Sequence, residues 1–117
     1  MRRLTVLFCL SMVALGGFAQ GVRFVGCSFD EAKALASREG KLIFVDVYTS
    51  WCGPCRRMSK DVFTDESVGS YFNAHYVCLQ LDAEKECGHG FFGSYTPSAY
   101  PSFYWLTPEG ELLDSRS

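Results

Sequence analysis

Hydrophobic and polar residues follow two alternating periods along this chain, one typical of strands and one typical of helices. Continuous apolar runs at 42–48, 76–81 and 102–106 predict three strands, and the first two are expected to be covered on both faces. Between these two strands, apolar residues recur at helical spacing from Pro54 to Phe72. Strands that alternate with helices in this way indicate an α/β layer structure.

Capping signals predict where the helices begin and end. The run from Ser28 to Glu31 has the pattern of a capping box, which predicts a helix that begins there and ends at Glu39 or Gly40. Thr64 is expected to cap the second half of the later helical stretch.

The remaining segments carry weaker patterns. Residues 22–25 predict a short edge strand, and residues 83–98 predict a loop with at most a short helix, because that segment is poorly periodic and contains glycine. A turn at 108–110 is followed by residues 111–114, which are expected to begin a strand that pairs back as a hairpin.

The beginning of the chain has a different pattern from the rest. Two arginines precede an almost uncharged, mostly apolar stretch at 4–18, which is typical of a secretory signal. Small residues at Gly17 and Ala19 predict cleavage after Ala19. An uncleaved membrane anchor is the alternative, although roughly 15 apolar residues are fewer than the ~20 that span a bilayer. We therefore expect a signal peptide at 1–19, one domain at 20–117 and a periplasmic or secreted protein.

Size and charge narrow the classes of function. A chain of 117 residues fits a single compact domain, and its 48% apolar and 21% charged residues are typical of a soluble globular protein. The net charge is -2, and lysines and arginines are scattered rather than gathered in a stripe that could neutralise a phosphate backbone. Nucleic acid is therefore not an expected partner.

Removal of the signal would leave five cysteines, namely Cys27, Cys52, Cys55, Cys78 and Cys87. Because the number is odd, at least one thiol must be free, buried or paired with another molecule. Cys78 lies in an apolar strand and is expected to be buried and inert, whereas Cys87 lies in a loop. A Cys27–Cys87 disulfide is compatible with this pattern.

The chemistry is expected at Trp51-Cys52-Gly53-Pro54-Cys55, where a buried strand passes into a helix. Unpaired amides at a helix N-terminus favour a thiolate, so Cys52 is the candidate nucleophile and Cys55, one turn further, is its partner. Gly53 would allow a tight turn, and Pro54 suits the first turn of a helix. Trp51 would shield the pair and offer a contact surface to another chain.

Two other uses of this cysteine pair compete with a redox role. A zinc site would need further ligands, which Cys87 and His89 could supply, but C-x-H is an unusual half of a structural site, so we expect no metal. A purely structural disulfide is the second alternative, although a Trp-flanked Gly-Pro pair at an exposed helix start suits that role poorly.

These motifs carry a family resemblance. The segments KLIFVDVYTSWCGPCRRM, VFTDESV, YVCLQLDAEK and YPSFYWLTPEG resemble the thioredoxin superfamily. More narrowly, they are similar to exported bacterial thioredoxin-like proteins, including the C-terminal domain of thiol:disulfide interchange proteins. The resemblance extends from Ser28 to Asp114 and implies a three-layer fold with a central mixed sheet flanked by helices.

The resemblance also implies roles for particular residues. It implies a cis peptide before Pro101 that faces the cysteine pair, with Tyr100 and Pro101 offering a backbone edge to substrate. Asp46, an anomalous carboxyl in an apolar strand, would be buried beneath Cys55 as a proton acceptor.

The sequence departs from the family pattern in two places. Many thioredoxins have a lysine on the neighbouring strand that faces the buried aspartate, and Cys78 is expected at the matching position here. The family fold also ends with a helix packed on the sheet, whereas this sequence reaches Ser117 soon after its closing hairpin begins. We therefore expect a domain without the C-terminal helix and with an apolar sheet face left open.

Together these features predict a thiol–disulfide oxidoreductase. Cys52 would attack a substrate disulfide, and Cys55 would resolve the mixed disulfide with Asp46 as proton acceptor. Because the Gly-Pro dipeptide is the one seen in reducing thioredoxins, reduction of protein disulfides is the expected direction. No cofactor is expected, and an exported reductase would need an electron donor at the membrane, since so short a chain shows no NADPH site. The alternative is a binding module that holds partner proteins without turnover.

Overall fold

The fold is built around a four-stranded sheet. A computed structural model describes residues 20–117, except for the side chains of Glu86 and His89, so the predicted signal peptide at 1–19 lies outside the described residues. Along the chain the elements are α1 (Phe29–Glu39), β1 (Leu42–Tyr48), α2 (Gly53–Arg57), the π-helix η1 (Met58–Val62), α3 (Glu66–His75), β2 (Tyr76–Asp82), the 3₁₀ helix η2 (Glu86–Gly88), α4 (His89–Phe92), β3 (Ser102–Leu106) and β4 (Leu112–Arg116). Within residues 20–117, no helix is both long enough and apolar enough to cross a bilayer.

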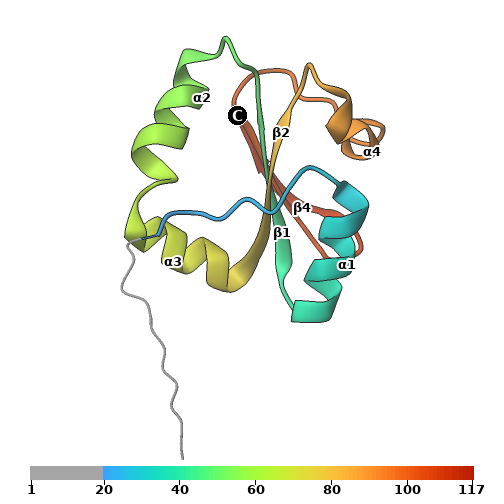
Figure 1. Cartoon of the computed structure of the whole chain (residues 1–117). Helices are drawn as coiled ribbons and strands as arrows, with labels where there is room; N and C mark the ends of the chain where they lie inside the picture. The colour runs from blue at the N-terminus through green and yellow to red at the C-terminus, as the bar shows by residue number, and fades with distance from the viewer. Residues whose placement is uncertain (1–19) are drawn as a thin grey trace, which may run out of the picture.

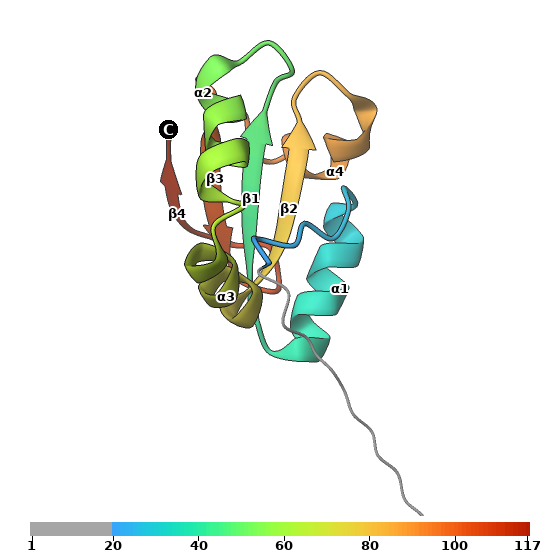
Figure 2. The same ribbon diagram turned by 60° about the vertical axis from the view of Figure 1, so that its left-hand side comes forward.

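Sheet topology and helix placement agree with the predicted three-layer arrangement. The strand order is β2-β1-β3-β4, with β2 parallel to β1 and the other neighbours antiparallel. Helices α1 and α4 lie on one face of the sheet, and α2 and α3 lie on the other (Figure 1). The turned view shows the strands side by side, with β4 at one edge and β2 at the other (Figure 2). The mixed sheet flanked by helices is thereby confirmed.

The central strand β1 divides its side chains between the two layers. Successive residues of a strand point to opposite faces. Ile43, Val45 and Val47 pack in the core formed with α1, whereas Phe44 packs in a second core with Phe63. Because Asp46 alternates with Val45 and Val47, its carboxyl points to the Phe44 face, on the side of α2.

The first predicted capping signal is confirmed. The Oγ of Ser28 accepts a hydrogen bond from the Glu31 amide at 3.1 Å, and α1 ends at Gly40, which has a left-handed φ of 68°. Glycine adopts this conformation without the clash that a Cβ would cause. The two signals fix α1 at its predicted bounds, so its apolar face packs on the sheet.

The second capping prediction is wrong by one residue. Asp65, not Thr64, caps α3, because its Oδ1 accepts hydrogen bonds from the amides of Ser67 and Val68 at 2.9 and 3.1 Å. The Thr64 hydroxyl instead donates to the carbonyl of Lys60 in the preceding helix. A carboxylate can accept two amides and complements the positive end of the helix, which favours Asp65 as the cap.

The two segments with weak sequence patterns, 22–25 and 83–98, form little regular secondary structure. Residues 22–25 form a single bridge, Phe24 to Cys78, rather than the predicted edge strand, and Gly26 follows with a φ of 136°. The predicted loop at 83–98 contains the short helices η2 and α4. A disulfide between Cys27 and Cys87 joins the two segments.

Between the sheet and the α2–α3 layer lies an apolar groove of about 260 Å³. It is lined by Phe44, Met58, Val62, Phe63, Val68, Phe72, Phe103 and Trp105. All five residues of β4, the strand that closes the hairpin with β3, are exposed.

Candidate active site

The cysteine pair lies where β1 passes into α2, as predicted. Cys52 is the N-cap residue of α2, and Cys55 lies in its first turn. The two form a disulfide with their Cα atoms 5.2 Å apart, and their exposed fractions are only 5% and 3%. The backbone amide of Cys55 donates a hydrogen bond to Sγ of Cys52 at 3.1 Å. An unpaired amide of the helix start is thus directed at the first sulfur of the pair.

The dipeptide between the cysteines is helical. Pro54 lies in the first turn of α2, where its missing N–H leaves no hydrogen bond unmade. Gly53 has no positive φ, and a Cβ added to it would meet only Nη1 of Arg57, at an ordinary contact of 3.6 Å. The backbone therefore does not require glycine at this position, in contrast to the expectation of a tight turn.

Trp51 is held beside the cysteine pair by two contacts. Its side chain is 62% exposed, and its Nε1 donates a hydrogen bond to Oε2 of Glu84 at 2.9 Å. Its ring meets the ring of Tyr100 edge to face, with centroids 6.0 Å apart. The indole thus forms an exposed but positioned apolar surface next to Cys52.

Tyr100 and Pro101 lie at the same end of the central strands as the cysteine pair. The Tyr100–Pro101 peptide is cis, as the resemblance implied. Ser102, the first residue of β3, pairs with Val47 near the end of β1. Because β1 and β3 are antiparallel, the segment before β3 and the segment after β1 lie at the same end of the sheet.

Asp46 is a buried carboxyl with an incomplete set of partners. Its exposed fraction is 1%, and this burial raises its pKa from 3.8 to about 6, while a hydrogen bond from Gln80 works in the opposite direction. The Nε2 of Gln80 donates to Oδ2 at 2.9 Å. Oδ1 has no hydrogen-bond partner within residues 20–117, and neither has the buried hydroxyl of Thr49.

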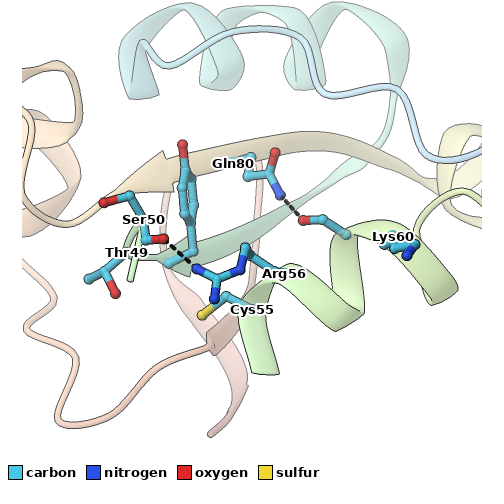
Figure 3. Close-up of a pocket in the computed structure, with 8 residues that line it drawn as sticks. Thr49, Ser50, Cys55, Arg56, Lys60 and Gln80 are labelled. Carbon is cyan, nitrogen blue, oxygen red and sulfur yellow. Dashed lines mark hydrogen bonds between the residues drawn. The ribbon is translucent and has the colours of Figure 1, made fainter. Parts of the chain in front are cut away.

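A cleft of about 530 Å³ opens beside Cys55. Its lining includes Thr49 and Gln80 together with the cationic side chains of Arg56 and Lys60. Figure 3 shows Gln80 reaching from β2 towards the active-site helix, with Cys55 on the same side of the sheet. The Arg56 guanidinium, which lines this cleft, donates to the Ser50 carbonyl at 2.7 Å.

Sequence reasoning missed Gln80 and misplaced the residue opposite Asp46. Cys78 was expected there, but in the parallel register Cys78 pairs with Phe44 and Gln80 pairs with Asp46. The signal that could have identified Gln80 is the one that singled out Asp46, a polar side chain within a buried strand. Ser59, which contacts Gln80, is half-buried in η1, and Glu84, which contacts Trp51, is exposed in a loop, and neither gave such a signal.

The remaining cysteines are separate from this site. Cys78 is unpaired and buried within the described chain, and burial raises its pKa to about 12. Cys87, considered above as a zinc ligand, instead pairs with Cys27. Among the side chains that the structure describes, which do not include those of Glu86 and His89, no three His, Cys, Asp or Glu gather in a way that could hold a metal ion.

Comparison with known proteins gives the family of this fold and site. Residues 25–108 match the family described as thioredoxin-like. Over 88 residues the chain is 31% identical to thiol:disulfide interchange protein DsbD 2 of Pseudomonas aeruginosa, a match that covers 74% of this chain and 15% of that protein. The chain spans less than a fifth of the length of this and two other curated relatives that it matches.

Solved structures give the same assignment. The solution structure of a proposed disulphide isomerase from Bacteroides thetaiotaomicron is 43% identical, with a TM-score of 0.71 over 85% of this chain and 82% of that one. A structure of DsbH oxidoreductase has a TM-score of 0.71 over 92% of this chain and 83% of that one, and at 17% identity this likeness shows a shared fold alone. The chain therefore belongs to the thioredoxin-like family, as its motifs predicted.

Proposed function

We propose that this protein is a thiol–disulfide oxidoreductase that reduces protein disulfides by dithiol–disulfide exchange. The observation that carries the proposal is the amide of Cys55, which donates to Sγ of Cys52 at 3.1 Å at the start of α2. Once the disulfide is reduced, an amide donor in this position stabilises negative charge on the sulfur. Cys52 is therefore the attacking thiolate, and Cys55 is the resolving thiol.

The exchange proceeds in two steps. The Cys52 thiolate attacks one sulfur of a substrate disulfide, which forms a mixed disulfide and releases the first substrate thiolate. Cys55 then loses its proton and attacks Sγ of Cys52, which restores the Cys52–Cys55 disulfide and releases the second substrate thiolate. Two electrons pass from the protein dithiol to the substrate.

Asp46 serves as the proton acceptor for Cys55. This role is supported by the unpartnered Oδ1 of Asp46 and by burial, which brings the pKa of its carboxyl to about 6. A general base works best when its pKa is close to the working pH. Gln80 lines the same cleft as Cys55 and also donates a hydrogen bond to the Asp46 carboxylate, which supports a place for Asp46 on the cleft side of the sheet.

The substrate meets the protein around the exposed indole of Trp51. Five residues form the contact surface that we propose, namely Trp51, Gly53, Pro54, Tyr100 and Pro101. The arrangement of Trp51 and Tyr100, with ring centroids 6.0 Å apart, supports an apolar platform for an unfolded or docking chain.

Direction, location and partners follow from the motif and the predicted signal peptide. We propose reduction as the direction because of the Gly-Pro dipeptide, and an exported location because of the signal pattern at 1–19. The relative from P. aeruginosa is named a thiol:disulfide interchange protein. A membrane protein of that chemical class is the electron donor that we propose for this chain.

A binding module that holds partners without turnover is the competing function. The two are separated by mixing the reduced protein with a disulfide-bonded protein substrate and counting the thiols released. An oxidoreductase releases two substrate thiols for each Cys52–Cys55 disulfide formed, whereas a binding module forms a complex and leaves the substrate disulfide intact. A Cys52→Ser variant is the matched control for non-specific release.

A further inference from the structure

Gln80 joins three elements around the buried carboxyl. Its Nε2 donates one hydrogen bond to Oδ2 of Asp46 at 2.9 Å and a second to Oγ of Ser59 at 3.0 Å. Asp46 belongs to β1, Gln80 to β2, and Ser59 to η1, which continues directly from the active-site helix α2. Figure 3 shows a dashed line from the Gln80 amide towards that helix, and this hydrogen bond is the one to Ser59.

We propose that Gln80 is a positioning residue that holds Asp46 by Oδ2 and leaves Oδ1 free to take the proton of Cys55 during resolution of the mixed disulfide. The inference rests on the proposed function, because it concerns the proton step of that reaction. In this step the S–H bond of Cys55 breaks and an O–H bond forms on Asp46. The resulting thiolate attacks Sγ of Cys52, and the bond between Cys52 and the substrate breaks.

The two oxygens of the Asp46 carboxyl have different surroundings, because Oδ2 accepts a hydrogen bond from Gln80 and Oδ1 accepts none from the described residues. Both hydrogens of the Gln80 amide are used, one on Asp46 and one on Ser59, so the amide cannot rotate away without losing a bond on each side. Oδ1 is left without a partner in the described chain, although it is buried. A buried acceptor without a partner destabilises the fold and therefore calls for an explanation. Acceptance of a proton during the reaction is such an explanation.

Gln80 also sets how strongly Asp46 holds a proton. Burial disfavours the charged carboxylate, and a hydrogen bond to it favours the charged form, so the Gln80 amide lowers the pKa that burial raises. A neutral amide offsets the effect of burial only in part, so the pKa of the Asp46 carboxyl is about 6 and not its ordinary value. Asp46 can therefore accept a proton in one step and release it afterwards.

No other group in residues 20–117 hydrogen-bonds this carboxyl. On the same strand, Tyr48 carries a phenol whose pKa is raised by burial and by the charges of Asp82 and Asp46. From the helical layer, Arg56 and Lys60 line the cleft, and Arg56 is engaged with the Ser50 carbonyl. From β3, the residue paired with Asp46 is the uncharged Phe103. Gln80 is the one group that binds Asp46 directly.

The direct test is the titration of the Asp46 carboxyl, followed by carbon NMR in the oxidised protein. Gln80→Met keeps the length of the side chain but removes both hydrogen bonds, so the titration midpoint should move upward from its wild-type value. Gln80→Lys places a positive donor beside the carboxylate, so the midpoint should move downward. Ser59→Ala, which leaves the bond to Asp46 in place, is the matched control and should cause a smaller upward shift than Gln80→Met.

A purely structural role for Gln80 would not produce shifts of opposite sign. Equal midpoints in the wild type and Gln80→Met, or shifts of the same sign in Gln80→Met and Gln80→Lys, would overturn the inference. If Gln80→Lys does not fold, the wild type, Gln80→Met and Ser59→Ala still test the inference. The upward shift of the Asp46 midpoint must then be larger in Gln80→Met than in Ser59→Ala.

Kinetics separate this inference from the proposed function. The rate of mixed-disulfide resolution, measured against pH by stopped flow, should show its rising limb displaced in each variant by the same interval as the NMR midpoint. If the wild type reduces no protein disulfide, the proposed function fails. If the wild type is active but the rising limb of the pH–rate profile is not displaced together with the Asp46 titration midpoint, the inference about Gln80 fails and the proposed function stands.

Discussion

The backbone amide of Cys55 donates a hydrogen bond to Sγ of Cys52 at 3.1 Å. The bond is made within the first turn of α2, with Cys52 as the N-cap and Pro54 in that turn. Because the donor belongs to the backbone, substitution of the Cys55 side chain leaves it in place. The two cysteines are therefore unequal, and their roles can be separated by single substitutions.

Cys55→Ser should trap mixed disulfides with substrate proteins, whereas Cys52→Ser should trap none and should abolish reduction. The first variant keeps the attacking sulfur and its amide donor but lacks the resolving thiol. Mass spectrometry of non-reduced complexes measures the outcome. The assignment would be reversed if alkylation of the reduced wild type at mildly acidic pH labelled Cys55 before Cys52.

Asp46→Asn should slow resolution of the mixed disulfide more than its formation, because in the proposed mechanism the carboxyl accepts the proton of Cys55 and not that of Cys52. Loss of a positioned general base typically costs about 10²–10⁴ in rate. Stopped-flow measurements distinguish the two steps. Wild-type rates for both steps in the variant would rule out Asp46 as the proton acceptor.

Asp46→Asn should also change stability in a pH-dependent way. Asp46 has a pKa of about 6 in the folded protein, against an ordinary value of 3.8, so the folded state binds more protons than the unfolded chain between these two pH values. The stability contributed by that proton is complete below pH 3.8 and is lost as pH rises through about 6. Two pKa units correspond to about 3 kcal/mol.

The Asn variant should therefore be more stable than the wild type at neutral pH by up to about 3 kcal/mol, and equally stable near pH 4. Denaturant unfolding of the oxidised proteins at several pH values measures the difference. Asp61→Asn, which alters an exposed carboxyl in η1, is the matched control and should show no such trend. A constant difference between wild type and Asp46→Asn across this range would contradict the raised pKa.

The Cys27–Cys87 disulfide should contribute to stability but not to catalysis. It joins residues 60 apart in sequence, and closing a loop of that size in the unfolded chain contributes about 4 kcal/mol. The double variant Cys27→Ser, Cys87→Ser should unfold at lower denaturant concentration and keep its rate of substrate reduction. Cys78→Ala, which removes the buried unpaired thiol, should also keep that rate. Loss of reduction in a folded double variant would show that the second disulfide takes part in turnover.

Trp51→Ala should weaken binding of protein substrates while leaving the reaction with a small aromatic disulfide largely unchanged. The indole is 62% exposed beside the cysteine pair, so its removal takes away contact area rather than a reacting group. Steady-state kinetics with both substrates report the effect as a higher KM for the protein. Tyr71→Ala removes an aromatic side chain of 54% exposure on α3, and an equal change in KM there would contradict a specific role for Trp51.

Periodicity and capping predicted most of the fold because local residues decide those features. β1 has the predicted bounds, because its run of seven residues, apolar except for Asp46, lies between polar segments. The cap of α3 was missed because Thr64 and Asp65 are both good caps, and the choice depends on the Lys60 carbonyl, which only the folded helix brings within reach of Thr64.

The candidate site was predictable where a motif defines it and not where strands must be aligned. Trp51 to Cys55 could be located from the sequence because five consecutive residues carry the signal. The partner of Asp46 could not, because the parallel register of β1 and β2 is set by packing on both faces of the sheet and not by residues near Gln80. The contact between Trp51 and Glu84 likewise links segments that are 33 residues apart.

The reduction potential of the Cys52–Cys55 pair is the most direct test of the claim that this protein is a disulfide reductase. The protein is equilibrated in glutathione buffers, and alkylation with mass spectrometry separates this pair from Cys27 and Cys87. We expect a potential close to that of reducing thioredoxins, about -270 mV, with electrons passing from the protein to substrate disulfides. A potential of about -120 mV, with the Cys52–Cys55 disulfide passing to reduced substrates, would instead make the protein an oxidase and contradict the proposed function.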